Sequence, residues 1–152
     1  MQLRYESPEF AEELKRRING NGEYRGKAKG MTWKTLFIVE DIRFAVYSDY
    51  SDGELVERKH VPSSQIEEYR KKADFVVGIP TYELSVEIAT GRKSLETLFM
   101  SGTLKLEGSI FKALQYRGAI EMAAKITADL TNESNIPSKE DFVKMLSEQG
   151  LL

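Results

Sequence analysis

The stretch FMSGTLKLEG at residues 99–108 combines a turn signal with a short strand pattern. Ser101 and Gly102 are residue types that favour turns. Residues 103–107, TLKLE, then alternate polar and apolar side chains, which is typical of a strand with one buried face. Gly108 ends this strand, and an apolar helical pattern follows it. The stretch therefore predicts a turn, a strand and a helix in quick succession.

The sequence on both sides of this stretch has apolar residues at helical spacing. Leu95, Leu98 and Phe99 recur at this spacing before the turn, and apolar residues continue from Ile110 to Leu130 after the strand. Periodicity alone does not distinguish an ordinary core helix from the wall of a ligand site. The two helices are expected here, and their role is left open at this point.

Four further strands are expected before this region. Residues 33–39 and 42–50 are rich in β-branched and aromatic residues, and only Glu40-Asp41 separates them, which predicts a hairpin. Residues 54–61 resemble a third, more polar strand. The run FVVGI at residues 75–79 has no polar alternation, as expected for a strand covered on both faces.

Helices are expected at both ends of the chain and between the strands. Ser7-Pro8 begins an N-terminal helix at residues 7–19, and Ser138 begins a C-terminal helix at residues 138–149. The segment after the first helix, through Arg25, Lys27 and Lys29, is expected to be a mobile basic loop. Strands and helices in this order indicate an α+β fold and not a repeating βαβ one.

Length and composition exclude several classes of protein. With 152 residues, of which 41% are hydrophobic, we expect a single domain spanning residues 1–152, with its core at about residues 33–130. No cysteine and one histidine argue against disulfides, thiolate chemistry and multi-ligand metal sites, so no metal and no cofactor are expected. A net charge of −2 argues against nucleic acid as a partner. No signal peptide or membrane span is seen, and we expect a cytoplasmic protein.

His60 is the side chain on which any general-base mechanism would have to depend. It lies in the polar strand before Val61-Pro62, and no nucleophile motif such as G-x-S-x-G accompanies it. We therefore expect a structural histidine and no catalytic residues. A small hydrolase that uses His60 is kept as the least favoured alternative.

The stretch at residues 99–108 resembles the sterol carrier protein 2 (SCP2) family, whose members carry a similar F-x-SG-x-LK-x-x-G segment before an apolar helix. Upstream, residues 73–77, ADFVV, resemble a strand of that family, and residues 88–91, IATG, resemble its short helix and turn. The order of elements from Trp33 to about Leu130 also matches. The resemblance implies a five-stranded mixed sheet covered by helices.

The same resemblance implies a non-enzymatic lipid-binding or lipid-transfer protein with an apolar tunnel. Its ligand would be a fatty acid, an acyl-CoA, a sterol-like lipid or an isoprenoid. Carried over to this sequence, the implied ligand-binding residues are Phe99, Met100, Leu104, Leu106, Ile110, Phe111, Leu114 and Met122. Transient contact with a membrane surface is left open. The main alternative is an interaction or homodimerisation module of a larger assembly in which the tunnel has collapsed.

Overall fold

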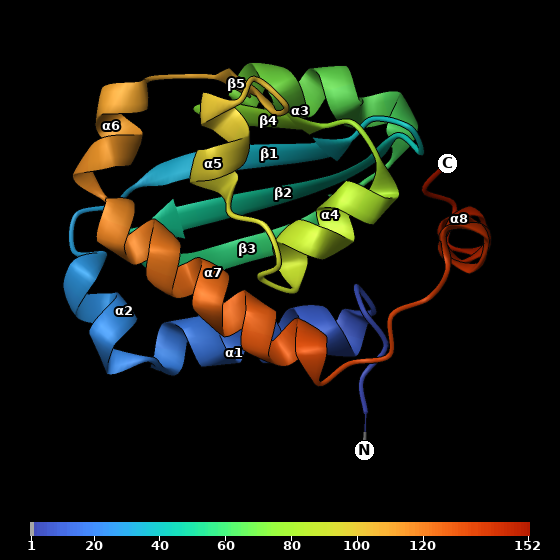
Figure 1. The fold of residues 1–152 in the computed structure, drawn as a ribbon, viewed down its shortest axis with the longest axis horizontal. Coiled ribbons are helices and arrows are strands. Elements are labelled where there is room, and N and C mark those ends of the chain that lie inside the picture. The colour runs from blue at the N-terminus through green and yellow to red at the C-terminus, as the bar shows by residue number, and fades with distance from the viewer. Residues whose placement is uncertain (1) are drawn as a thin grey trace.

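Five strands form one mixed sheet in the order β3-β2-β1-β4-β5 (Figure 1). The computed structural model describes residues 2–152. Neighbouring strands are antiparallel except β1 and β4, which are parallel. The strands are β1 (Trp33–Val39), β2 (Phe44–Ser51), β3 (Glu54–Val61), β4 (Phe75–Ile79) and β5 (Lys105–Glu107). The expected five-stranded α+β fold is thereby confirmed.

Helices surround this sheet and account for most of the remaining chain. Before the sheet come α1 (Pro8–Gly20) and α2 (Gly22–Lys27). A 3₁₀ turn (Ser63–Gln65) and α3 (Ile66–Lys72) connect β3 to the parallel strand β4. The others are α4 (Tyr82–Ala89), α5 (Leu95–Met100), α6 (Ile110–Gln115), α7 (Arg117–Asn132) and α8 (Lys139–Glu148). No helix within residues 2–152 is long and apolar enough to cross a membrane; the cytoplasmic location stays a prediction.

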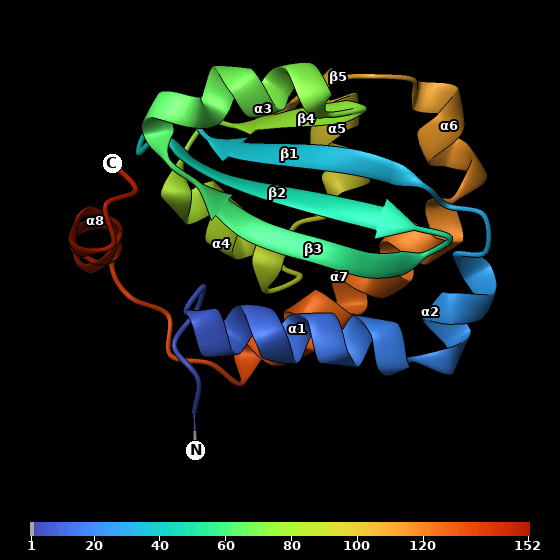
Figure 2. The ribbon, with the colours of Figure 1, turned by 180° about the vertical axis from the view of Figure 1, so that it is seen from behind.

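The two faces of the sheet are covered differently. On one face, α3 packs against a small cluster that includes Leu36, Tyr47 and Ile66. The other face carries the larger core, to which α1, α2, α7 and α8 contribute, and a smaller cluster under α4 and α5. Figure 2 shows the sheet from behind, with β1 to β3 in front of α4. Residues at alternate positions of each strand therefore enter different clusters, as the pleat requires.

The exposed edge strand β3 lies next to α1 (Figure 2). The side-chain amide of Asn19 donates to the carbonyl of Leu55 at 3.0 Å, and its oxygen accepts from the Leu55 N–H at 2.8 Å. This pair imitates the hydrogen bonds of a neighbouring strand. It satisfies backbone groups that would otherwise be free to pair with another chain.

The two terminal segments meet in an aromatic cluster at one end of the sheet. Phe142 of α8 is fully buried, and its ring lies 5.0 Å from Phe44, 4.9 Å from Tyr82 and 6.1 Å from Tyr5, measured between ring centroids. Tyr5 in turn packs edge-on against Phe10 of α1. The expected N-terminal and C-terminal helices are confirmed, and both belong to the main core.

Two expectations about local structure were wrong. The segment expected to be a mobile loop contains α2, whose first turn is capped by the Asn21 side chain and whose Tyr24 is fully buried, with its hydroxyl donating to the carbonyl of Gly53 at 2.8 Å. The expected hairpin turn of only Glu40-Asp41 was also wrong, because residues 40–43 form the turn and β2 begins at Phe44; the N–H groups of Glu40 and Asp41 donate to the carbonyls of Ile79 and Pro80. In both places contacts with distant residues decide the backbone conformation.

Candidate functional site

The Ser101-Gly102 turn ends α5 and directs the chain into β5. The Ser101 hydroxyl donates to the Leu98 carbonyl at 3.1 Å, and Gly102 has a φ of 78°, in the region that favours glycine. Leu104, the first apolar residue after the turn, is buried against Leu98 and the β4 side chains. The turn predicted from the sequence is thus confirmed, and it anchors the start of the strand.

The short strand β5 presents Leu106 to the helix-covered face of the sheet. Leu106 lies opposite Val77 of β4 and contacts both the main core and the cluster under α5. Its neighbour Glu107 lies on the α3 side, where its carboxylate pairs with Arg70. Gly108 then has a φ of 127°, and a Cβ there would lie 2.5 Å from the Asp74 carbonyl oxygen. Only glycine fits at the point where the chain leaves the sheet for α6.

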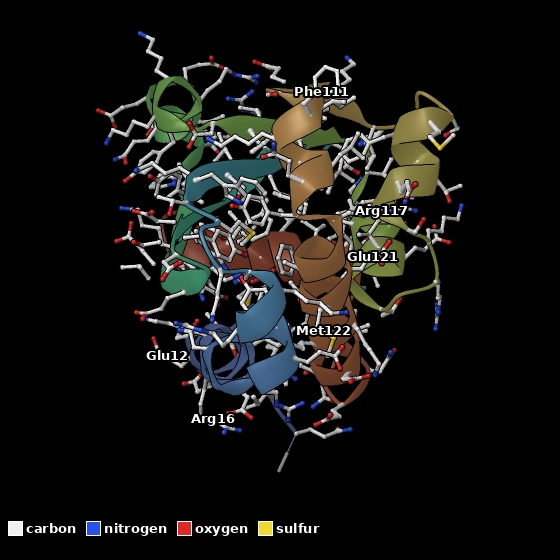
Figure 3. The ribbon with its side chains drawn as sticks, turned by 90° about the vertical axis from the view of Figure 1, so that its left-hand side faces the viewer. Glu12, Arg16, Phe111, Arg117, Glu121 and Met122 are labelled. Atoms are coloured by element: carbon white, nitrogen blue, oxygen red, sulfur yellow. The ribbon has the colours of Figure 1, made fainter. Side chains whose placement is uncertain are left out.

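Helix α6 buries none of its residues and leaves its large apolar side chains in contact with solvent. Phe111 is 81% exposed, and Ile110 and Leu114 are each 57% exposed. Figure 3 shows Phe111 at the far end of α6 from Arg117. The residue after the helix, Tyr116, attaches this region to the sheet, because its ring packs edge-on against Trp33 with centroids 5.5 Å apart.

Helix α5 adds Met100, which is 83% exposed, and lies close to the start of α7. The guanidinium of Arg117 pairs with Glu96 of α5 at 2.9 Å and with Glu121 at 3.2 Å. We call Met100, Ile110, Phe111 and Leu114 the exposed apolar set. Burial of a large apolar side chain contributes about 1.5–3 kcal/mol, so covering the exposed parts of these four contributes about 4–8 kcal/mol.

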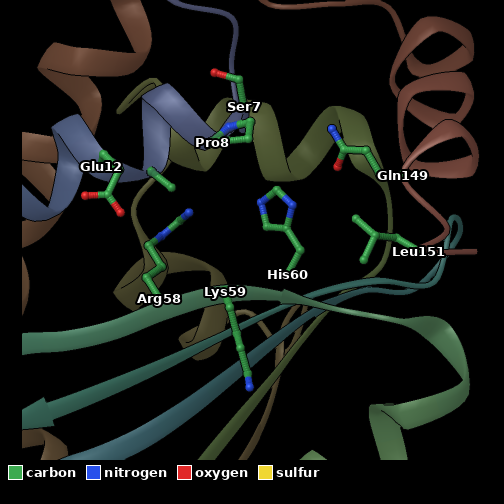
Figure 4. A pocket seen from close by; sticks show the side chains of 9 residues that line it. Ser7, Pro8, Glu12, Arg58, Lys59, His60, Gln149 and Leu151 are labelled. Carbon is green, nitrogen blue, oxygen red and sulfur yellow. The ribbon is translucent and has the colours of Figure 1, made fainter.

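The eight residues implied by the resemblance are thus placed in three kinds of environment. The exposed apolar set supplies four of them, Leu104 is buried, and Phe99, Leu106 and Met122 are partly buried against the core. Two surface cavities, of about 350 Å³ (Figure 4) and 280 Å³, lie among residues 2–152, and none of the eight lines either of them. Their role as a ligand wall therefore stays a prediction, as does the tunnel itself.

His60 belongs to a buried cluster with two residues that the sequence analysis did not single out. Glu6 accepts from both terminal nitrogens of Arg58 at 2.8 Å, and its carboxylate lies 3.1 Å from His60 Nε2. Burial raises the pKa of Glu6, but the charge of Arg58 and the hydrogen bonds from His60 and Arg58 outweigh it, so its pKa lies well below the ordinary value. The alternation of Arg58 and His60 along a polar strand was the only signal of this cluster in the sequence.

No group of three or more metal-ligating side chains occurs within the part of the chain that the structure describes. The family model of the SCP-2 sterol transfer family matches residues 11–121, which span most of the strands and helices described above. No curated protein matches the sequence.

Several solved structures share the fold. A crystal structure of sterol carrier protein 2 superposes with a TM-score of 0.66 at 22% identity, covering 80% of this chain and 95% of that one. A solution structure of a Thermus thermophilus protein, described as possibly a sterol carrier protein, gives 0.65 at 22% identity and covers 87% and 91%. A variant of the sec-alkyl sulfatase PisA1 gives 0.51 at 24% identity over 74% of this chain, but only 16% of that much longer one.

Proposed function

Because the chain belongs to the SCP-2 sterol transfer family, whose members bind lipids, we propose that it binds a lipid without catalysing a reaction on it and carries or presents that lipid. The observation that supports this proposal is the exposed apolar set on α5 and α6. Its four residues are among the eight that the family resemblance implies for the ligand site. An apolar chain lying on them removes their surface from water.

The weak attachment of α6 provides a way for the ligand to bind. Because α6 buries none of its own residues, its displacement exposes little additional core. A lipid chain then lies along the exposed Ile110, Phe111 and Leu114 of α6. Each buried methylene of the chain contributes about 0.8 kcal/mol, which is a gross gain before the cost of ordering the chain and the helix.

The proposal is tested with delipidated protein titrated with a fluorescent fatty acid, and with native mass spectrometry of the protein as purified. Phe111→Asp places a charge in the exposed apolar set without disturbing a buried side chain, so we expect at least a tenfold loss of affinity with unchanged thermal stability. Val56→Asp is the matched control, because Val56 is an exposed apolar residue on β3, at the opposite edge of the sheet. Saturable uptake that is equal in both variants and the parent would reject this surface as the ligand site.

The class of lipid is resolved by competition. Unlabelled fatty acid, acyl-CoA, a sterol and an isoprenoid alcohol are each used to displace the fluorescent probe from the parent protein. The classes that displace it with the lowest inhibition constants define the ligand. If the protein neither carries lipid when purified nor takes up any of the four classes, the carrier function is rejected.

A second candidate function rests on the same exposed apolar set. Such a set can also be covered by another copy of the chain or by a larger protein, and the similarity to one part of PisA1 shows that this fold occurs within larger chains. Size-exclusion chromatography with light scattering distinguishes the two functions. A dimer that dissociates in the Phe111→Asp variant and takes up no lipid favours the interaction module.

A further inference from the structure

The two edges of the sheet differ in how far the chain itself closes them. At the β3 edge, the side chain of Asn19 binds both backbone groups of Leu55. Strand β5 is the last strand at the opposite edge, at the top of Figure 1. Among residues 2–152, the backbone of residues 105–107 forms no hydrogen bonds other than those of its pairing with β4. The outer side of β5 is therefore free to pair with a further strand.

The charges on β5 suit pairing with a second copy of the same strand. Lys105 and Glu107 lie on one face of the sheet, and Leu106 lies between them on the other face. In an antiparallel pair centred on Leu106, Lys105 lies directly opposite Glu107 of the second copy, and Glu107 lies opposite the second Lys105. Opposite charges in facing positions stabilise a strand pair, and like charges destabilise it. A parallel pair in register would place each charge against its own kind.

Both charged side chains are accessible for this pairing. Lys105 is exposed, and the ion pairs within residues 2–152 leave it without a carboxylate partner. The side chain of Glu107 is 61% exposed, although one of its oxygens accepts from Arg70. Its other oxygen remains for a second cation, while Arg70 keeps the carboxylate on the α3 side of the strand. Charged residues usually keep edge strands apart, but here the two signs are arranged so that antiparallel copies attract.

The same register brings exposed apolar side chains of the two copies together. It places Thr103 opposite Ser109 of the second copy, so the turn after α5 in one copy lies beside the start of α6 in the other. Met100 is the last residue of α5, and Phe111 lies in the first turn of α6. These two are the most exposed of the exposed apolar set. Contact between them removes apolar surface from water and adds to the few hydrogen bonds of a three-residue strand.

We propose that β5 is the interface of a homodimer, in which the edges of two copies pair antiparallel about Leu106 and join the two sheets into one. The two-fold axis passes between the two Leu106 residues. Each copy then uses the same surface, and the assembly closes at two chains. No lipid takes part in this pairing, so a monomeric protein would leave the proposed lipid function standing.

The dimer is tested with the purified, delipidated chain by light scattering after size-exclusion chromatography and by sedimentation equilibrium over a wide range of concentrations. The parent should form a dimer. Lys105→Glu places a glutamate against Glu107, and Glu107→Lys places a lysine against Lys105, so each variant alone should show a dimer Kd at least about tenfold higher. An equimolar mixture of the two variants should recover dimerisation, because in the mixed dimer every glutamate again faces a lysine.

Lys144→Glu is the matched control, because it makes the same change of charge at an exposed lysine of α8, away from β5 in Figure 1. It should leave the dimer Kd unchanged. A parent that stays monomeric at all concentrations overturns the proposal. A dimer that forms equally well in Lys105→Glu and Glu107→Lys also overturns it, since another surface then joins the copies. A mixture that stays as dissociated as each variant alone would show that the two charges do not face one another.

Discussion

The Glu6→Gln variant should lose a large part of the stability of the protein. Glu6 and Arg58 are almost completely buried, and the glutamine would leave the Arg58 guanidinium without its counter-charge in the core. Breaking a buried ion pair in this way costs about 3–5 kcal/mol. In a chain of this length, that corresponds to a melting temperature about 6–20 °C lower. Removing the carboxylate of Glu9, which is exposed, should change stability by less than about 0.5 kcal/mol.

Urea denaturation of the parent and Glu6→Gln proteins at several pH values tests the reasoning further. The folded-state pKa of Glu6 is lowered by Arg58 and His60, so its contribution is present above the pKa of an unfolded glutamate, about 4.3, and is lost as the pH falls below it. The difference between the two proteins should therefore shrink by about 1.4 kcal/mol per pH unit below about pH 4. A cost below about 1 kcal/mol at neutral pH, or a difference that does not change with acidification, would refute this account.

Three further changes test other parts of the fold by thermal or urea denaturation. Asn19→Ala removes both hydrogen bonds to Leu55 and should cost about 1–3 kcal/mol; a loss of less than half of that would mean that water replaces the amide at no cost. Gly108→Ala should destabilise more than Gly102→Ala, because both glycines have positive φ but only Gly108 would place its Cβ against the backbone of a neighbouring strand. Phe142→Ala, in the aromatic cluster of α8, should cost about 3–5 kcal/mol, and a smaller loss would show that the cluster closes around the cavity.

Much of the sheet could be predicted because the hydrophobic patterns and turn residues that indicate its strands lie within short stretches of the sequence. The polar strand at residues 54–61 and the apolar strand at residues 75–79 form where their patterns place them, and the hairpin forms with a longer turn, at residues 40–43. Helix α2 was missed because its six residues are too few to show periodicity. Burial of Tyr24 against the turn at Gly53, far along the chain, stabilises it.

The candidate sites could be predicted only in part, because exposure and pairing there depend on contacts between residues that are far apart in the sequence. The composition of α6 identifies Phe111 and Leu114 as apolar, but the same pattern fits a buried helix and an exposed one, and only the fold distinguishes them. Glu6 pairs with Arg58 and His60, which lie 52 and 54 positions further along the chain. No local sequence pattern indicates such a pairing. The family resemblance implies residues for a lipid site, and their role stays a prediction, but it says nothing about the cluster around His60.

Helix α6 also determines where the protein is vulnerable to proteolysis. Since it is attached chiefly through Tyr116 and buries none of its own residues, it should unfold locally while the sheet stays intact, and its amides should exchange with deuterium long before those of β1. A protease that cleaves after aromatic residues would then cut first at Phe111. If the protein binds lipid at α6 as proposed, the bound lipid should slow that cut, and the digestion rate of the purified protein then measures the occupied fraction.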